Sequence, residues 1–267
     1  MDDQQFRQLL DHFGYSWEGY RKVRRGIKKR IDRHMQKLGC RTVDEYLHAL
    51  DKDEELRKHF ECLMTVSVSR FFRDRFLWRI IEGQILPAIV KEDRKKVKFW
   101  SAGCCCGEEV YSFKMVWESL RGRVDPMPEL EIWATDINPT YLRRAQDGIY
   151  SLTSLKEVPH SVRETYFILH AEHGLYRIAP SFKKGILWKV HNLLLELGEV
   201  DFQIILLRNS LLTYYKDEVK QSAFRKVMSC LAQEGFLIIG IHEKLPIGSK
   251  GLVAFSTQPY IFRKVRH

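Results

Sequence analysis

The sequence predicts an α/β protein with a mostly parallel sheet and a small antiparallel β insertion. From Val97 onward, strand-like apolar runs alternate with helical segments, which is typical of parallel strands joined by crossover helices. Before about residue 80, apolar residues recur at helical spacing instead. Two glycine-led runs, 174–178 and 185–190, resemble the two strands of an antiparallel hairpin. The chain should therefore combine helical, parallel β and antiparallel β parts.

The N-terminal part is expected to be a small helical bundle. Three groups of apolar residues each fall on one helical face: Phe6, Leu9, Leu10 and Phe13; Ile27, Ile31, Met35 and Leu38; Val43, Tyr46, Leu47 and Leu50. Thr42 can cap the third helix. We expect a basic helical domain with its linker over 1–80 and a sheet domain over 81–267, with the hairpin inserted at about 165–190.

The stretch from Thr65 to Asp74 interrupts the helical pattern. Its hydroxyl and β-branched residues favour extended backbone. Ser69 is positioned to cap a following helix, which places Arg73 one turn inside that helix. Taken alone, Arg73 is more simply explained as an exposed helical arginine.

A glycine-bounded loop follows the first predicted strand. Gly103 and Gly107 bracket small residues where the backbone must turn sharply, and Glu108 and Glu109 open the next helix. The spacing matches neither the dinucleotide fingerprint nor the phosphate-binding loop. An acidic pair repels polyphosphate and suits a cation, so S-adenosylmethionine fits this loop better than NAD or ATP. An ordinary strand-to-helix turn is the alternative.

Polar residues follow several predicted strands and should meet at the carboxyl edge of the sheet. Asp136 ends the second strand, where one carboxylate can accept hydrogen bonds from both ribose hydroxyls. It could instead cap the helix that begins near Pro139. Later strands end at Asn192 and at Arg208. Ligands of open α/β sheets bind along this edge.

The composition indicates a protein without a membrane span or a metal site. The 267 residues are 45% hydrophobic, with no run long enough to span a bilayer and no signal-peptide pattern at the N-terminus, so we expect a cytoplasmic protein. Cys104, Cys105 and Cys106 are consecutive, a spacing that matches neither zinc ligands nor a disulfide framework. We interpret them as small loop residues and predict no metal.

The formal net charge of +10 and the isoelectric point near 9.3 indicate an acidic partner. Much of the charge is concentrated in one early run: Arg21, Lys22, Arg24, Arg25, Lys28, Lys29, Arg30, Arg33 and Lys37. Such a run can be a solvated helix face. Because this one carries a single sign, it repels itself until an acidic surface docks.

Several motifs together resemble the CheR chemotaxis receptor methyltransferases. Ser101–Ser112 is similar to the family's S-A-G-C-S-T-G-E-E-P-Y-S signature, and Ser67–Arg73 to its N-x-T-x-F-F-R. Shorter matches follow in the family's order: Ala134–Asp136, Gly148–Tyr150, Asn192–Leu193, Arg208–Asn209 and Gly240–Glu243. The resemblance covers nearly the whole chain and implies a Rossmann-like class I methyltransferase sheet behind an N-terminal helical domain.

The resemblance implies an enzyme that uses S-adenosylmethionine to esterify glutamate side chains on the cytoplasmic domains of chemoreceptors, with S-adenosylhomocysteine as product. Glu109 would hold the ammonium group of the cofactor and Asp136 its ribose. The other cofactor-binding residues that it implies are Ser67, Ser69, Arg73, Gly103, Asn192, Leu193, Arg208 and Asn209. The basic helix, through Arg24, Arg25, Lys28 and Lys29, would contact the receptor. We expect a monomer with no stable nucleic-acid binding and no membrane insertion.

The expected chemistry needs few side chains. A glutamate carboxylate is already nucleophilic at neutral pH, so transfer requires in-line positioning and a water-poor cleft but no general base. Arg73 can orient the carboxylate through two parallel hydrogen bonds. The family's active-site tyrosine corresponds to Thr213 in an ungapped match and to Tyr214 with a one-residue insertion. We favour Tyr214 and leave Thr213 and the next residue, Tyr215, open.

The chain departs from the family pattern at two other places. Cys105 and Cys106 replace a Ser-Thr pair in the glycine loop, and Ser67 replaces an asparagine. Two alternative functions therefore stay open. The basic charge suits an RNA or DNA methyltransferase, although Arg208-Asn209-Ser210 is unlike the Asn/Asp-Pro-Pro-aromatic stretch typical of base amino methylation. The second alternative function is that of a regulator that binds the cofactor but does not transfer the methyl group.

Overall fold

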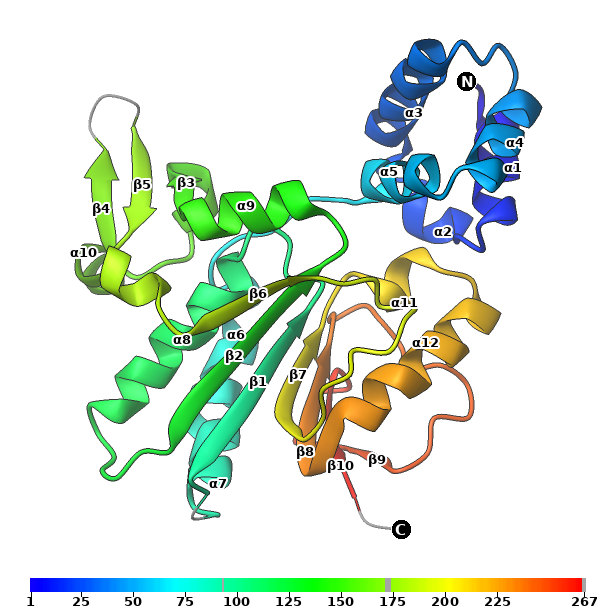
Figure 1. Cartoon of the computed structure of the whole chain (residues 1–267). Coiled ribbons are helices and arrows are strands. Elements are labelled where there is room, and N and C mark those ends of the chain that lie inside the picture. Colours follow the sequence, from blue (N-terminus) through cyan, green and yellow to red (C-terminus); the bar gives the residue numbers. More distant parts are fainter. Residues whose placement is uncertain (93, 171–173, 266–267) are drawn as a thin grey trace.

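The computed structural model describes residues 1–92, 94–170 and 174–265, and it confirms the predicted fold class. A seven-stranded sheet has the order β6-β2-β1-β7-β8-β10-β9, and a separate three-stranded sheet has the order β3-β5-β4. A helical N-terminal part precedes both. Figure 1 shows these helices beyond the carboxyl ends of the central strands, next to α11. Residues 171–173 and 266–267, which fall within the predicted insertion and second domain, lie outside the described residues.

Five helices in the first 64 residues share one apolar core. They are α1 (Asp3–His12), α2 (Trp17–Tyr20), α3 (Arg24–Leu38), α4 (Val43–Lys52) and α5 (Glu54–Met64). The core is built from the predicted helical faces, with Phe6, Ile31 and Tyr46 fully buried. Leu38, at the end of α3, is the exception and is exposed. Thr42 caps α4 as predicted, and Glu45 completes a capping box with it.

The large sheet is parallel from β6 to β8 and antiparallel at its last two strands. Its strands are β1 (Lys96–Ala102), β2 (Glu129–Asp136), β6 (Ile186–Val190), β7 (Phe202–Leu207), β8 (Leu231–Ile239), β9 (Leu252–Ala254) and β10 (Ile261–Lys264). All six residues of β7 are buried, as expected for a central parallel strand with both faces covered. This central position brings the end of β7 beside that of β1.

Helices cover the large sheet and connect its strands. They are α6 (Arg75–Ile80), the π-helical η1 (Ile81–Ile85), α7 (Leu86–Val90), α8 (Glu108–Arg121), α9 (Pro139–Asp147), α11 (Leu211–Tyr214) and α12 (Asp217–Cys230). In Figure 1, α12 lies in front of the sheet and α6 behind it. No helix in the described part of the chain is long and apolar enough to cross a membrane.

The predicted hairpin between 174–178 and 185–190 was wrong. β5 (Leu175–Ile178) pairs antiparallel with β4 (Phe167–His170) and with β3 (Ile149–Ser151), whereas β6 joins the large sheet parallel to β2. The insertion also contains η2 (Leu152–Leu155), α10 (His160–Tyr166) and η4 (Pro180–Lys183). Strand propensity identified the segments, but their partners depend on packing against distant strands.

The predicted helix start near Ser69 was also wrong. α6 begins at Arg75, and the residue before it, Asp74, has a left-handed backbone with φ of 65°. Arg73 therefore lies in the turn before the helix rather than one turn inside it, and its carbonyl accepts a hydrogen bond from the indole of Trp78 at 2.9 Å. The segment before α6 is thereby fixed against the sheet domain.

The helical part and the large sheet have separate apolar cores, and the boundary between them falls before α6. Met64 belongs to the helical core, whereas Leu77 and Trp78 belong to the core of the large sheet. We propose that the division between the domains lies near residue 65 rather than at residue 80. The helical part packs closely against α11. At Gly19 there is no room for a side chain, since a Cβ atom would lie 2.2 Å from the carbonyl oxygen of Thr213.

Candidate functional site

Two adjoining cavities lie at the carboxyl edge of the large sheet. One has a volume of about 110 Å³ and lies between the helical domain and the ends of β2 and β6. The other has a volume of about 50 Å³ and lies beside β1 and β7. Four residues line both cavities, which makes them one continuous cleft: Val66, Gly103, Cys105 and Asn209. The cleft lies where ligands of open α/β sheets bind.

The glycine loop forms the floor of this cleft. Gly103 and Gly107 both have φ of 85°, which confirms the predicted sharp turn. A Cβ atom on Gly103 would lie 3.0 Å from Cβ of Ser210, so the backbone approaches the neighbouring strand end closely. Cys105 also has a positive φ, of 52°, and its backbone N–H donates to the Asp136 carboxylate at 2.9 Å. The loop and the end of β2 are therefore joined.

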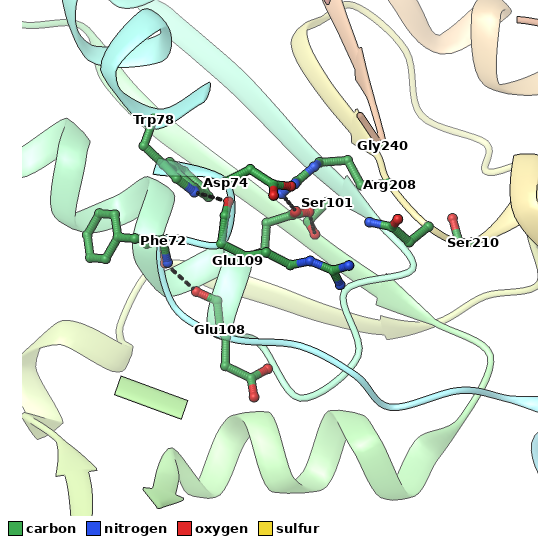
Figure 2. A network of polar contacts seen from close by, with 12 residues as sticks. Phe72, Asp74, Trp78, Ser101, Glu108, Glu109, Arg208, Ser210 and Gly240 are labelled. Atoms are coloured by element: carbon green, nitrogen blue, oxygen red, sulfur yellow. Dashed lines mark hydrogen bonds and ion pairs between the residues drawn. The ribbon is translucent and has the colours of Figure 1, made fainter. Parts of the chain in front are cut away.

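Arg208 is fixed between two carboxylates beside the loop. Its side chain is 3% exposed, donates to Glu109 at 2.7 Å and forms an ion pair with Asp74. Ser101 donates to the other oxygen of Glu109 at 3.2 Å. Figure 2 shows Asp74, Arg208 and Glu109 converging from three separate elements. Of these three side chains, Glu109 and Arg208 line the smaller cavity, and the fixed Glu109 carboxylate can receive a cationic ligand group there.

Asp136 lies at the end of β2 with its carboxylate in the larger cavity. Its oxygens accept from the backbone N–H groups of Cys105 and Asn138, each at 2.9 Å. Asn138, not Asp136, caps α9, so the capping alternative was wrong. Burial raises the pKa of the Asp136 carboxyl, and the backbone N–H groups of Asn138, Cys105 and Ile137 offset part of that rise. The carboxylate oxygens can also accept from a ligand hydroxyl.

Asn192 and Leu193 line the far end of the larger cavity, beyond Asp136. The Asn192 side chain accepts from the backbone N–H of Leu194 at 3.0 Å and donates to Glu61 of α5 at 3.3 Å. Ile137 lies at the same end and provides an apolar wall. This end of the cleft can hold a flat, largely apolar group with a polar edge.

The segment before α6 closes the smaller cavity. Arg73 and Ser69 line that cavity, and the Arg73 guanidinium donates to the carbonyl oxygen of Val68 at 3.0 Å. Ser67 lines a neighbouring hollow beside Glu108 instead of the cleft. Of the three residues predicted here, the structure brings Ser69 and Arg73 to the cleft and leaves Ser67 outside it.

The three residues considered for the tyrosine position occupy different surroundings. Thr213 donates to Glu243 at 2.5 Å, and the ring of Tyr215 packs against Tyr15 at 4.8 Å. Tyr214 and Tyr215 both line the larger cavity. Burial raises the pKa of the Tyr214 phenol to about 12, so it stays protonated at neutral pH. Its hydroxyl can donate a hydrogen bond but cannot act as a base.

The four basic residues predicted to contact a partner differ in their exposure. Arg24 and Lys28 form ion pairs with Asp3 at 3.1 and 2.9 Å. Arg25 and Lys29 are exposed one turn apart on α3. The structure therefore leaves the second pair available to an acidic surface and uses the first pair within the helical domain.

Sequence reasoning missed two acidic residues: Glu61, which lines the cleft, and Asp74, which pairs with Arg208 beside it. Asp74 gives no local signal, because its role depends on a left-handed turn that brings it to Arg208. Glu61 does give one, since it follows buried Phe60 and lies one turn before buried Met64 on α5. An acid on the apolar side of an amphipathic helix is a detectable exception to the pattern.

The cleft fits S-adenosylmethionine on its own geometry. The Glu109 carboxylate, fixed by Arg208, lies at one end, and the buried Asp136 carboxylate, suited to a ribose, lies in the middle. An apolar wall with polar neighbours lies at the other end. Glu108 and Glu109 follow the loop in the positions where a phosphate-binding site presents donors. This arrangement suits a cationic nucleoside without phosphate.

Comparison with known proteins gives the family. The family model described as "CheR methyltransferase, SAM binding domain" matches residues 67–261, and "CheR methyltransferase, all-alpha domain" matches residues 3–65. A chemotaxis protein methyltransferase from Listeria monocytogenes is 35% identical over 82% of this chain and 81% of its own. Its counterpart from Listeria innocua is 34% identical over the same shares, and that from Borreliella burgdorferi is 25% identical over 91% and 87%. The chain belongs to the CheR family of S-adenosylmethionine-dependent methyltransferases.

Proposed function

We propose that this protein methylates glutamate side chains on the cytoplasmic domains of chemoreceptors. The observation that best supports this substrate is Arg73 at the mouth of the cofactor cleft. Its guanidinium makes one hydrogen bond, to Val68, among the described residues. The remaining N–H donors are free to orient an incoming carboxylate.

The cofactor would be held by the residues that line the cleft. Glu109, kept in place by Arg208 and Ser101, would bind the ammonium group, and Asp136 would bind the ribose hydroxyls. The remaining contacts would come from Ser69, Gly103, Asn192, Leu193 and Asn209. When bound, S-adenosylmethionine supplies an electrophilic methyl group on its sulfonium.

The side chains near Arg73 match transfer to a carboxylate. The substrate glutamate is already ionised, so the site needs no group that removes a proton. Tyr214, with its pKa raised to about 12, would donate a hydrogen bond from the cleft wall. Arg73 would orient the glutamate while the cleft limits water. Both roles concern position rather than proton transfer.

The exposed basic face of α3 would dock on the acidic receptor surface. We expect charge reversal of Arg25 and Lys29 to glutamate to lower the methylation rate at low receptor concentration by about tenfold, because long-range attraction accelerates association. Binding of S-adenosylhomocysteine should not change. The comparison is initial rate against receptor concentration at low and at high salt.

A matched control for this variant lies at the opposite end of the sheet. Lys91 and Lys95 are exposed near the start of β1, and reversing both alters the net charge by the same amount. If both double variants slow methylation equally, the effect comes from net charge and α3 is not the docking face.

The substrate class is tested by offering labelled S-adenosylmethionine to receptor-containing membranes and, separately, to an RNA pool. Alkali-labile label on receptor protein supports the proposal, and an Arg73→Ala variant should lose most of it. Label in RNA would support the nucleic-acid alternative, which the basic charge also suits. Cofactor binding without any transfer would support a regulator instead.

A further inference from the structure

Glu61 places an acidic side chain from the helical domain in the wall of the cofactor cleft. It lies on α5, its side chain is 16% exposed, and it lines the larger cavity together with Ile137 and Asn192. None of the family motifs in the sequence includes it. Its position therefore calls for a separate explanation.

The Glu61 carboxylate is poorly paired for a group so little exposed. One oxygen accepts a long hydrogen bond from the Asn192 amide at 3.3 Å. The other has the Arg57 guanidinium at 3.9 Å, which is beyond hydrogen-bonding distance. Within the described parts of the chain no closer donor reaches it. Buried carboxylates are normally hydrogen-bonded, so this oxygen is poised to accept from a ligand.

The order of the strands shows which part of the cofactor would meet Glu61. The sheet runs β7, β1, β2, β6, with Arg208 at the end of β7, Asp136 at the end of β2 and Asn192 just beyond β6. A cofactor with its amino acid at Arg208 and its ribose at Asp136 extends its base toward Asn192. That is the end of the cleft where Glu61 lies.

We propose that Glu61 accepts a hydrogen bond from the exocyclic amine of the adenine base and so makes the helical domain part of the cofactor site. Asn192 would orient the Glu61 carboxylate and would not itself accept the hydrogen bond from the adenine amine. Its side-chain oxygen already accepts from Leu194 at 3.0 Å, and its amide group donates to Glu61. Burial also raises the pKa of the Glu61 carboxyl, as expected for a group that lacks close donors.

This contact makes a chemical prediction about base selectivity. A base with a carbonyl oxygen in place of the amine would bring two acceptors together at Glu61, and the site would reject it. The proposal concerns the family's cofactor and does not depend on which macromolecule receives the methyl group. It can therefore succeed or fail independently of the proposed substrate.

The test is calorimetric titration of the full chain with S-adenosylhomocysteine and with S-inosylhomocysteine, which carries the carbonyl oxygen. We expect the wild type to bind the adenine compound about 100-fold more tightly. Glu61→Gln keeps the size of the side chain and gains a donor, so it should reduce that preference to about tenfold or less. A fold-preserving control is Glu55→Gln, an exposed position on the same helix. Equal preference ratios in the wild type and Glu61→Gln would overturn the proposal, whatever the absolute affinities.

Discussion

Replacement of Arg208 by methionine should strongly destabilise the sheet domain and weaken cofactor binding. The guanidinium is nearly inaccessible and pairs with both Asp74 and Glu109. Its removal leaves two carboxylates facing one another without a cation. Breaking a buried pair in this way typically costs about 3–5 kcal/mol in the free energy of unfolding. Denaturant unfolding of the variant and the wild type measures the difference.

Two further variants separate charge from geometry. Arg208→Lys keeps the charge but cannot bridge two carboxylates with a planar fork, so it should recover only part of the loss. Adding Asp74→Asn to Arg208→Met removes one of the two stranded charges and should restore part of the stability. An Arg208→Met protein as stable as the wild type would show that the ion-pair cluster contributes nothing to the fold.

Replacement of Asp136 by alanine should raise the dissociation constant of S-adenosylhomocysteine by about 100-fold or more. A carboxylate that accepts from two ribose hydroxyls contributes roughly 1.5–3 kcal/mol per hydrogen bond. The variant also leaves the backbone N–H groups of Cys105 and Asn138 without their acceptor, so the glycine loop loses one of its hydrogen bonds to β2. Calorimetric titration gives the affinity.

The pH dependence of the same titration provides an internal check. Burial raises the folded-state pKa of Asp136 above the usual 3.8, so the side chain takes up a proton at a higher pH than an exposed aspartate. Because ribose hydroxyls bind the ionised form best, affinity should fall as the pH is lowered through that raised pKa. Asp136→Asn should bind more weakly and lose this component of the pH dependence. An unchanged profile would place the ribose elsewhere.

The fold was predictable where local sequence determines the element. Buried parallel strands such as β7 appear as continuous apolar runs, and Gly103 and Gly107 mark a turn that few other residues allow. The pairing of β6 was not predictable in this way. Its residues suit a strand in either sheet, and only packing beside β2 selects the parallel partner.

The site was predictable where a residue follows a strand directly. Asp136 and Arg208 reach the cleft because parallel strands end at one edge. Asp74 and Glu61 come from segments whose position depends on how the linker and the helical domain contact the sheet. Ser67 shows the converse, since its neighbour two residues on lines the cleft while Ser67 itself faces another hollow.

The most direct test of the proposed function is to identify the atom that receives the methyl group. A purified cytoplasmic receptor domain is incubated with the protein and S-adenosylmethionine, digested and analysed by tandem mass spectrometry. Glutamate side chains should gain the mass of one methylene, mild alkali should reverse the gain, and Arg73→Ala should abolish most of it. A stable methyl group on a nitrogen atom, or an unmodified receptor beside methylated RNA, would contradict the assignment.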